Sequence, residues 1–368
     1  MMMIDRSRAA LRWTWVLVCF AILNFTPLHA QSTVPALNEA GWKMIQQGEP
    51  ARAVPLFAQA LVLRPDDPVL LYGAGVAAHL DGRSTEAKSK LRRVLELNPR
   101  FTPASLLLGE IVYRDGDVDR AITMYEAALA FAPMDRDLNG RLREWRGESA
   151  VHGTFVEHQQ GRFSVMFEGR TDAALAARAT QSLTTAFARI AQQLRASPQA
   201  PIAVILYTEK QFRDITRAPA WSSGLYDGRI RIPVAGATRS PALFDAVLTH
   251  ELAHAMIVSI APNGVPTWLH EGLAQHFSGA DPEAARRRLA RGGTMISFED
   301  LEQSFAEFSG ADAMTAYDES LVAVHRLAQR PNLNWGQLLY ALGETDTPSE
   351  ALRKFGISYV DLDAEFTR

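Results

Sequence analysis

Small and apolar residues in the first half of the chain recur at a fixed interval of 34 positions. Small residues let two helices of one unit approach closely, a larger side chain fills the space between them, and a proline ends the second helix. The pattern predicts three two-helix units at 34–67, 68–101 and 102–135. Five columns keep this register: Gly41, Gly75 and Gly109; Gly48, Gly82 and Gly116; Ala53, Ala87 and Ala121; Phe57, Leu91 and Tyr125; and Pro65, Pro99 and Pro133.

This register resembles the tetratricopeptide repeat. Residues 137–146 are expected to form a capping helix over the last unit, which makes 31–150 an all-α domain. The resemblance implies a concave surface suited to a peptide or a partner protein. The sequence leaves two roles open for these repeats: recruitment of a partner or substrate, and a rigid platform for the rest of the chain.

Beyond the repeats, the hydrophobic pattern changes to short strands followed by helices. Residues 155–157 and 163–167 have the composition of strands, and 202–207 form an apolar run typical of a buried strand. An alanine-rich helix lies between them, and helical periodicity dominates the chain after residue 240. We therefore expect a small mixed sheet and a helical tail in a second domain, 151–368, and an α+β fold class overall.

A hairpin is predicted just before the longest helical segment. Asp227-Gly228 is a strong turn signal, and 229–232 alternate polar and apolar residues, as a strand does. Pro233 has no backbone N–H to donate, so it would end the ladder, as is typical of an edge strand.

The most informative stretch of the chain is His250-Glu251-Leu252-Ala253-His254. Positions i and i+4 lie one turn apart on the same face of a helix, so both imidazoles can reach one metal ion. Glu251 is rotated by roughly 100° from His250, which places its carboxylate beside the metal and not on it. Two nitrogen ligands, a bound water and a neighbouring base are what a hydrolytic zinc site requires.

A third ligand is expected on the next helix. Asn263-Gly264 signals a turn and Pro266 starts a second helix, which would bring Glu271 opposite the two histidines. His270 is the competing candidate, but it points some 100° away from Glu271 on that helix. Glu271 is preferred because His₂Glu is an established ligand set for catalytic zinc.

These two segments together resemble the gluzincin superfamily of zinc metallopeptidases. The resemblance rests on Leu248-Thr249-His250-Glu251-Leu252-Ala253-His254 followed by Trp268-Leu269-His270-Glu271-Gly272, and it covers about 224–278 most specifically. It implies Zn²⁺ held by His250, His254 and Glu271, with Glu251 as the catalytic base.

The resemblance also implies two further groups in the site. Gluzincins bind the substrate backbone on an edge strand before the zinc helix, and 221–234 is similar to that element. Gly224 and Leu225 are therefore candidate substrate-binding residues, although an ordinary structural hairpin is the alternative. Tyr317 lies in a segment similar to the helix that supplies an oxyanion-stabilising tyrosine in the family, and packing between helices is its alternative role.

The N-terminal segment, 1–30, is expected to be a signal peptide. Arg6, Arg8 and Arg12 precede an apolar stretch at 13–25, and Leu28-His29-Ala30 offers a cleavage site. The stretch is shorter than the roughly 20 residues of a membrane-spanning helix, so membrane attachment would require an uncleaved segment. The only cysteine, Cys19, lies inside it, so the exported chain would have no disulfide and no thiolate ligand.

Composition agrees with an exported globular protein of two domains. The chain has 368 residues, 47% hydrophobic content and a formal net charge of −3, which becomes about −5 once the signal segment is removed. This mild acidity gives no argument for binding nucleic acid.

Two functions are consistent with these features. The first is a periplasmic or secreted zinc-dependent peptidase that acts on a peptide or protein substrate. The alternative is a non-catalytic envelope adaptor that binds a protein partner through its repeats. Glu251 favours the peptidase, because a structural zinc site needs no base.

Overall fold

The 34-residue register corresponds to three pairs of packed helices in the structure. The structure, a computed structural model, describes residues 33–131, 133–169, 173–198, 201–218, 222–234, 240–292, 295–305, 308–345 and 347–366. The expected signal segment lies outside the described residues. The repeat helices are α1 (Val34–Gln46), α2 (Pro50–Leu63), α3 (Pro68–Leu80), α4 (Ser84–Leu97), α5 (Thr102–Arg114) and α6 (Val118–Leu129).

The repeating glycines explain why these helices can pack so closely. A β-carbon at Gly41 would lie 2.7 Å from the ring of Phe57, and one at Gly109 would lie 2.7 Å from the ring of Tyr125. A contact this short is a steric clash, so only glycine leaves room for the aromatic ring of the paired helix. A second glycine column forms the turns between paired helices, where φ is positive: Gly48, Gly82 and Gly116.

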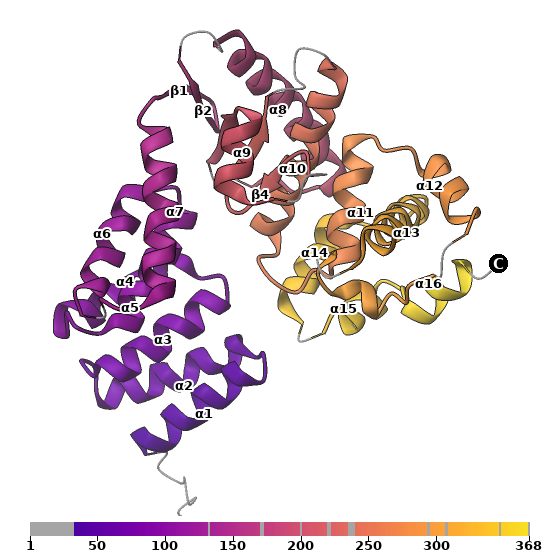
Figure 1. The fold of residues 1–368 in the computed structure, drawn as a ribbon. Helices are drawn as coiled ribbons and strands as arrows, with labels where there is room; N and C mark the ends of the chain where they lie inside the picture. The colour runs from indigo at the N-terminus through magenta and orange to yellow at the C-terminus, as the bar shows by residue number, and fades with distance from the viewer. Residues whose placement is uncertain are drawn as a thin grey trace, which may run out of the picture.

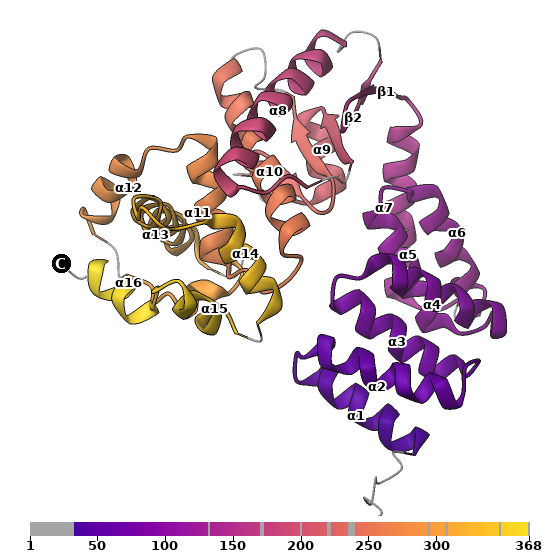
Figure 2. The same cartoon turned by 180° about the vertical axis from the view of Figure 1, so that it is seen from behind.

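Helix α7 (Arg136–His152) covers the last repeat and then enters the second half of the chain. It begins where the Asp135 carboxylate accepts bonds from two backbone N–H groups, and its Trp145 stacks on Tyr113 at 4.6 Å. The helix extends past the expected end at residue 146 and leads directly into the sheet (Figures 1 and 2). Helices α1–α7 are called the repeat domain below, and the remainder is called the C-terminal half.

The C-terminal half contains a five-stranded mixed sheet with the order β1-β2-β3-β5-β4. Strands β2 and β3 and strands β3 and β5 are parallel, whereas the two outer pairs are antiparallel. Residues 229–232 were expected to form an edge, but β5 lies inside the sheet because the hairpin adds β4 outside it. The strands are β1 (Phe155–Gln160), β2 (Phe163–Glu168), β3 (Ile202–Tyr207), β4 (Leu225–Tyr226) and β5 (Ile230–Pro233).

The two faces of the sheet are covered by different parts of the chain. Val204 and Leu206 share a large core with helices α8 (Ala173–Leu194) and α10 (Pro241–Ile260). Ile205 and Tyr207 alternate with them and pack against α9 (Glu209–Thr216) and Val151, near the end of α7. The repeat domain therefore helps to cover one face of the sheet.

The rest of the C-terminal half is helical, so the described chain is mostly helical with one small sheet. Helices α11 and α13 contact each other so closely that a β-carbon at Gly272 would lie 2.5 Å from the Ser320 carbonyl oxygen. The remaining elements are α11 (Thr267–Ser278), α12 (Pro282–Leu289), η2 (Asp300–Glu302), α13 (Gly310–Ala328), α14 (Trp335–Glu344), α15 (Pro348–Lys354) and α16 (Tyr359–Phe366).

Among the described helices, α10 alone has the length and apolar composition of a membrane-spanning helix, and 56% of that stretch is buried inside the protein. A central core helix of a globular domain has the same properties.

Candidate metal centre and cleft

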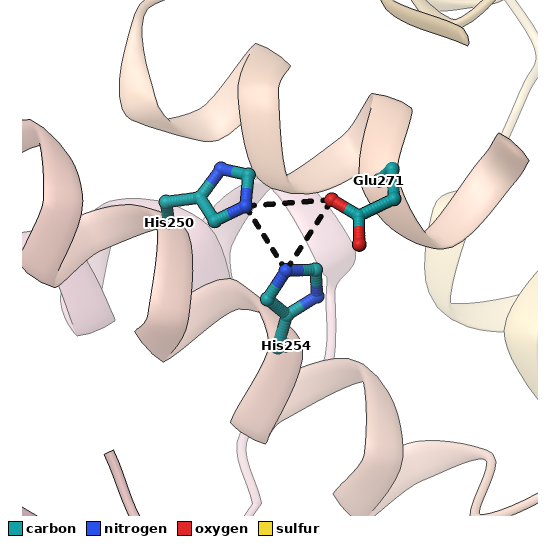
Figure 3. A group of neighbouring side chains, drawn as sticks. All are labelled: His250, His254 and Glu271. Atoms are coloured by element: carbon teal, nitrogen blue, oxygen red, sulfur yellow. Dashed lines mark hydrogen bonds and ion pairs between the residues drawn. The ribbon is translucent and has the colours of Figure 1, made fainter. Parts of the chain in front are cut away.

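Helix α10 and helix α11 bring the three predicted metal ligands together. His250 and His254 lie one turn apart on α10, and Glu271 comes from the facing side of α11 (Figure 3). The connection between the helices turns at Gly264, which has φ of +83°, and a β-carbon there would lie 2.2 Å from the Leu342 carbonyl oxygen of α14. Glycine at this position thus permits both the turn and the close packing of α14 on it.

The candidate ligand atoms form a small triangle. His250 Nε2 and His254 Nε2 lie 3.0 Å apart, and Glu271 Oε2 lies 3.5 Å from the first and 3.6 Å from the second (Figure 3). Ligands of a tetrahedral zinc ion, with bonds of about 2.0–2.1 Å, are separated by roughly 3.3 Å. The spacing of these three atoms therefore fits such an ion.

Two further observations agree with a cation at this position. Glu271 Oε2 is buried and makes no hydrogen bond among the described residues; its contacts there are the two histidine nitrogens at 3.5 and 3.6 Å. A buried carboxylate oxygen without a hydrogen bond is costly, and a metal ion between these three atoms would satisfy it. The donor set of two imidazoles and one carboxylate also suits zinc.

His270 contacts the site but lies outside the triangle of ligand atoms. Its ring stacks on that of His254 at an interplanar angle of 9°, and the two Nδ1 atoms lie 2.7 Å apart. If His254 gives its Nε2 lone pair to a metal, its Nδ1 carries the proton and donates to His270 Nδ1. The geometry thus gives His270 an orienting position, whereas its place beside Glu271 in the sequence indicates only a competing ligand.

Burial and charge shift the pKa values of the acidic groups in opposite directions. Burial raises the pKa of Glu251 to about 7. Burial also acts to raise the pKa of Glu271, but the neighbouring His254 and His250 outweigh it and bring the value to about 2. Glu271 is therefore an anion suited to bind a cation, whereas Glu251 is poised to exchange a proton near neutral pH.

The centre opens into a cleft of about 1130 Å³, lined in part by Gly224, Leu225 and Tyr317. Gly224 touches the base candidate directly, because a β-carbon there would lie 2.7 Å from Glu251 Oε1. Leu225 begins β4, the edge strand, so its backbone lies beside the cleft. All the candidate site residues named from the sequence thus lie around one cavity.

Tyr317 reaches the same cavity from α13. Its ring meets Phe305 edge-on at a centroid distance of 5.2 Å. Burial, together with the negative charges of Glu271 and Glu251, raises the pKa of its hydroxyl, which keeps the proton available for donation. Tyr317 therefore combines a packing role with a position inside the cleft.

Comparison with known proteins identifies the repeats. Two family models described as tetratricopeptide repeat match residues 41–99 and 78–141. No curated protein matches the chain.

Solved structures similar to the chain include tetratricopeptide repeat domains. The first tetratricopeptide domain of Spaghetti (RPAP3), bound to an HSP90 peptide, is 23% identical, with 32% of this chain and 97% of that chain covered and a TM-score of 0.31. The Sgt2 tetratricopeptide domain from Aspergillus fumigatus is 20% identical, with 39% and 93% covered and a TM-score of 0.32. The family matches and the packing of α1–α6 agree: the N-terminal region of this chain is built of tetratricopeptide repeats.

Proposed function

We propose that this protein is an exported zinc-dependent peptidase whose C-terminal half has a gluzincin-like organisation. The observation that carries the proposal is the triangle of His250, His254 and Glu271 with a buried Glu251 beside it. Zinc, when bound, supplies Lewis acidity and lowers the pKa of water.

Glu251 is the proton carrier in this proposal. Its side chain is buried, with 6% of its surface exposed, and burial raises its pKa to about 7. A carboxylate with this pKa accepts a proton from the attacking water and then delivers it to the leaving amine. Since Glu251 lies against Gly224 in the lining of the cleft, the proton would be transferred beside the segment that leads into β4.

Strand β4 and Tyr317 would position the substrate. β4 pairs with β5 on one side only, so backbone groups at its free edge can bond to an extended peptide. The Tyr317 hydroxyl remains protonated and can donate to the oxyanion of a tetrahedral intermediate. These assignments give Leu225 and Gly224 a binding role and Tyr317 a stabilising one.

The second candidate function is a protein-binding adaptor without catalysis. The family-model matches all lie within residues 41–141, in the repeats, so the comparisons favour this function more directly than the peptidase. Tetratricopeptide repeats indicate protein–protein interaction. In this case the metal centre would be structural and Glu251 would have no chemical task.

Zinc analysis and peptide cleavage by the purified chain distinguish the two functions. The peptidase proposal expects one zinc per chain and cleavage of peptides in a broad library. Glu251→Gln should then lower the rate by about 10²–10⁴-fold with zinc content unchanged. Glu283→Gln, on the exposed surface of α12, is the matched control. A native chain that binds zinc but cleaves nothing supports the adaptor.

A further inference from the structure

The repeat domain and the C-terminal half meet at a buried cluster of charges. Glu148 of α7 lies 2.9 Å from the Arg231 guanidinium and 3.1 Å from that of Arg229, and each of these side chains is at most 3% exposed. Tyr113 of α5 donates its hydroxyl to Glu148 at 2.5 Å, and the Arg229 guanidinium lies 4.6 Å over its ring. Charges this deeply buried are costly unless they are paired.

This cluster fixes the substrate-binding hairpin to the repeats. Arg229 precedes β5 directly and Arg231 is paired with Leu225 of β4 in the sheet register. Arg231 also bonds to Asp227 in the turn at 2.9 Å. Separating the two halves would leave both guanidinium groups without Glu148. The hairpin is therefore joined to the repeat domain by buried ion pairs.

The same interface brings Arg114 into the cleft. Arg114 is the last residue of α5, next to Tyr113, and it lines the cavity that also contains Gly224 and His250. The turn packs on it closely, because a β-carbon at Gly228 would lie 3.0 Å from the Arg114 carbonyl oxygen. One end of the cleft thus belongs to the repeat domain.

The end of the cleft beside Arg114 carries an uncompensated positive charge. Arg114 is exposed, and its guanidinium has no acidic partner within 4.0 Å among the described residues. The neighbouring acids are engaged elsewhere: Asp227 pairs with Arg231, and Asp115 pairs with Lys88 at 2.5 Å. Arg217 also lines this end, although it lies 3.2 Å from Glu144. A carboxylate is the group that such a surface attracts.

We propose that Arg114 of the repeat domain binds a carboxylate of the peptide substrate. A peptide extended along β4 runs from Gly224, beside Glu251, to the turn at Asp227-Gly228, beside Arg114. This path is about three residues, or roughly 10 Å of extended chain. The carboxylate is an Asp or Glu side chain about three residues from the scissile bond, or the C-terminus of a short peptide. This inference rests on the proposed peptidase function.

The test uses the zinc-loaded full chain with Glu251→Gln, so that peptides bind without being cleaved. Labelled peptides carry Asp or Asn at each position in turn, with a free or an amidated C-terminus, and fluorescence anisotropy gives Kd. We expect one position at which Asp binds about tenfold tighter than Asn, and Arg114→Gln should remove this preference. Arg120→Gln, an exposed arginine outside the cleft, is the control and should retain it.

The outcomes separate this inference from the peptidase proposal. If Arg114→Gln removes a preference for the free C-terminus, the bound carboxylate is that of the peptide end. If it removes a preference for Asp over Asn at one position, the bound carboxylate is that of a side chain. If the native chain cleaves nothing while the Arg114-dependent preference is present, the binding site stands and the peptidase proposal fails. If the native chain cleaves peptides but acidic residues have no effect, or Arg114→Gln leaves the preference intact, the inference is overturned.

Discussion

Gly224 lies directly against the carboxylate of Glu251, with no space for a side chain between them. A β-carbon at position 224 would lie 2.7 Å from Glu251 Oε1 and 2.9 Å from its Cγ. The residue that leads into β4, the proposed substrate-binding strand, is therefore in contact with the group that would move the proton. A change in the position of either residue is expected to displace the other.

Gly224→Ala tests this contact. The added methyl group should displace the Glu251 carboxylate and lower peptide hydrolysis by about 10–100-fold, while zinc content stays at the native level because no ligand is touched. Steady-state kinetics and metal analysis on the same sample check both expectations. Gly310→Ala is the control, since nothing lies within 4 Å of its position. Unchanged hydrolysis in Gly224→Ala would show that Glu251 needs no fixed position.

The metal ligands and the proposed base should respond differently to substitution. His254→Ala removes a candidate ligand atom 3.0 Å from His250 Nε2 and should abolish stoichiometric zinc binding. Glu271→Gln should weaken zinc retention as well, because it removes the negative charge of the proposed third ligand. Glu251→Gln should keep the metal. Full zinc occupancy in His254→Ala would exclude this ligand set.

His270 is expected to act on zinc affinity through His254. His270→Phe keeps a ring for stacking but removes the Nδ1 acceptor that lies 2.7 Å from His254 Nδ1. Loss of such an orienting bond usually lowers metal affinity by about 10–100-fold. His270→Asn retains an acceptor near this position and should recover part of the affinity. Competition with a chelator of known affinity measures the zinc affinity of each variant. Equal zinc affinity in the native chain, His270→Phe and His270→Asn would contradict the orienting role.

Glu148 should be essential for the stability of the full chain. Glu148→Ala leaves the buried guanidinium groups of Arg229 and Arg231 without their shared partner, at a cost of about 3–5 kcal/mol. Denaturant unfolding of the full chain measures this loss. The control is Glu126→Ala, which breaks an exposed ion pair with Arg146 and should cost less than about 1 kcal/mol. Similar losses in the two variants would mean that the interface is open to water.

The buried His152 should make stability depend on pH. Burial lowers the pKa of its imidazole to about 4, from an ordinary value of about 6.5. The unfolded chain therefore binds more protons than the folded chain between these values, so stability is lost as pH falls from about 6.5 to about 4. The loss attributable to His152 is about 2–3 kcal/mol. His152→Gln should flatten the pH dependence of the unfolding free energy in this window, and an unaltered slope would contradict the prediction.

The repeats could be predicted closely from the sequence because their packing is local and periodic. The glycine and aromatic columns, such as Gly41 with Phe57, meet within one unit, and the same contact recurs in the next unit. The proximity of His250, His254 and Glu271 was also predictable, since it requires only helical spacing and one turn. Both relationships join residues near each other in the chain.

The contacts that sequence patterns did not reveal join distant segments. The alternation at 229–232 marks Arg229 and Arg231 as polar positions of a strand, which ordinarily face water. The structure instead buries both, because α7 extends to His152 and brings Glu148 over them. His270 is a comparable case. Its place next to Glu271 in the sequence predicts that it lies near the candidate metal centre, but its bond to His254 depends on how α10 and α11 face each other.

The charge cluster between the halves also limits how this gene can recombine. A repeat array taken from another protein and joined ahead of residue 153 would place its own side chain where Glu148 now lies. Unless that side chain is acidic, Arg229 and Arg231 would lose their shared counter-charge in a dry interface. We therefore expect the two halves to be inherited as a pair, with any change at one side of the cluster requiring a matching change at the other.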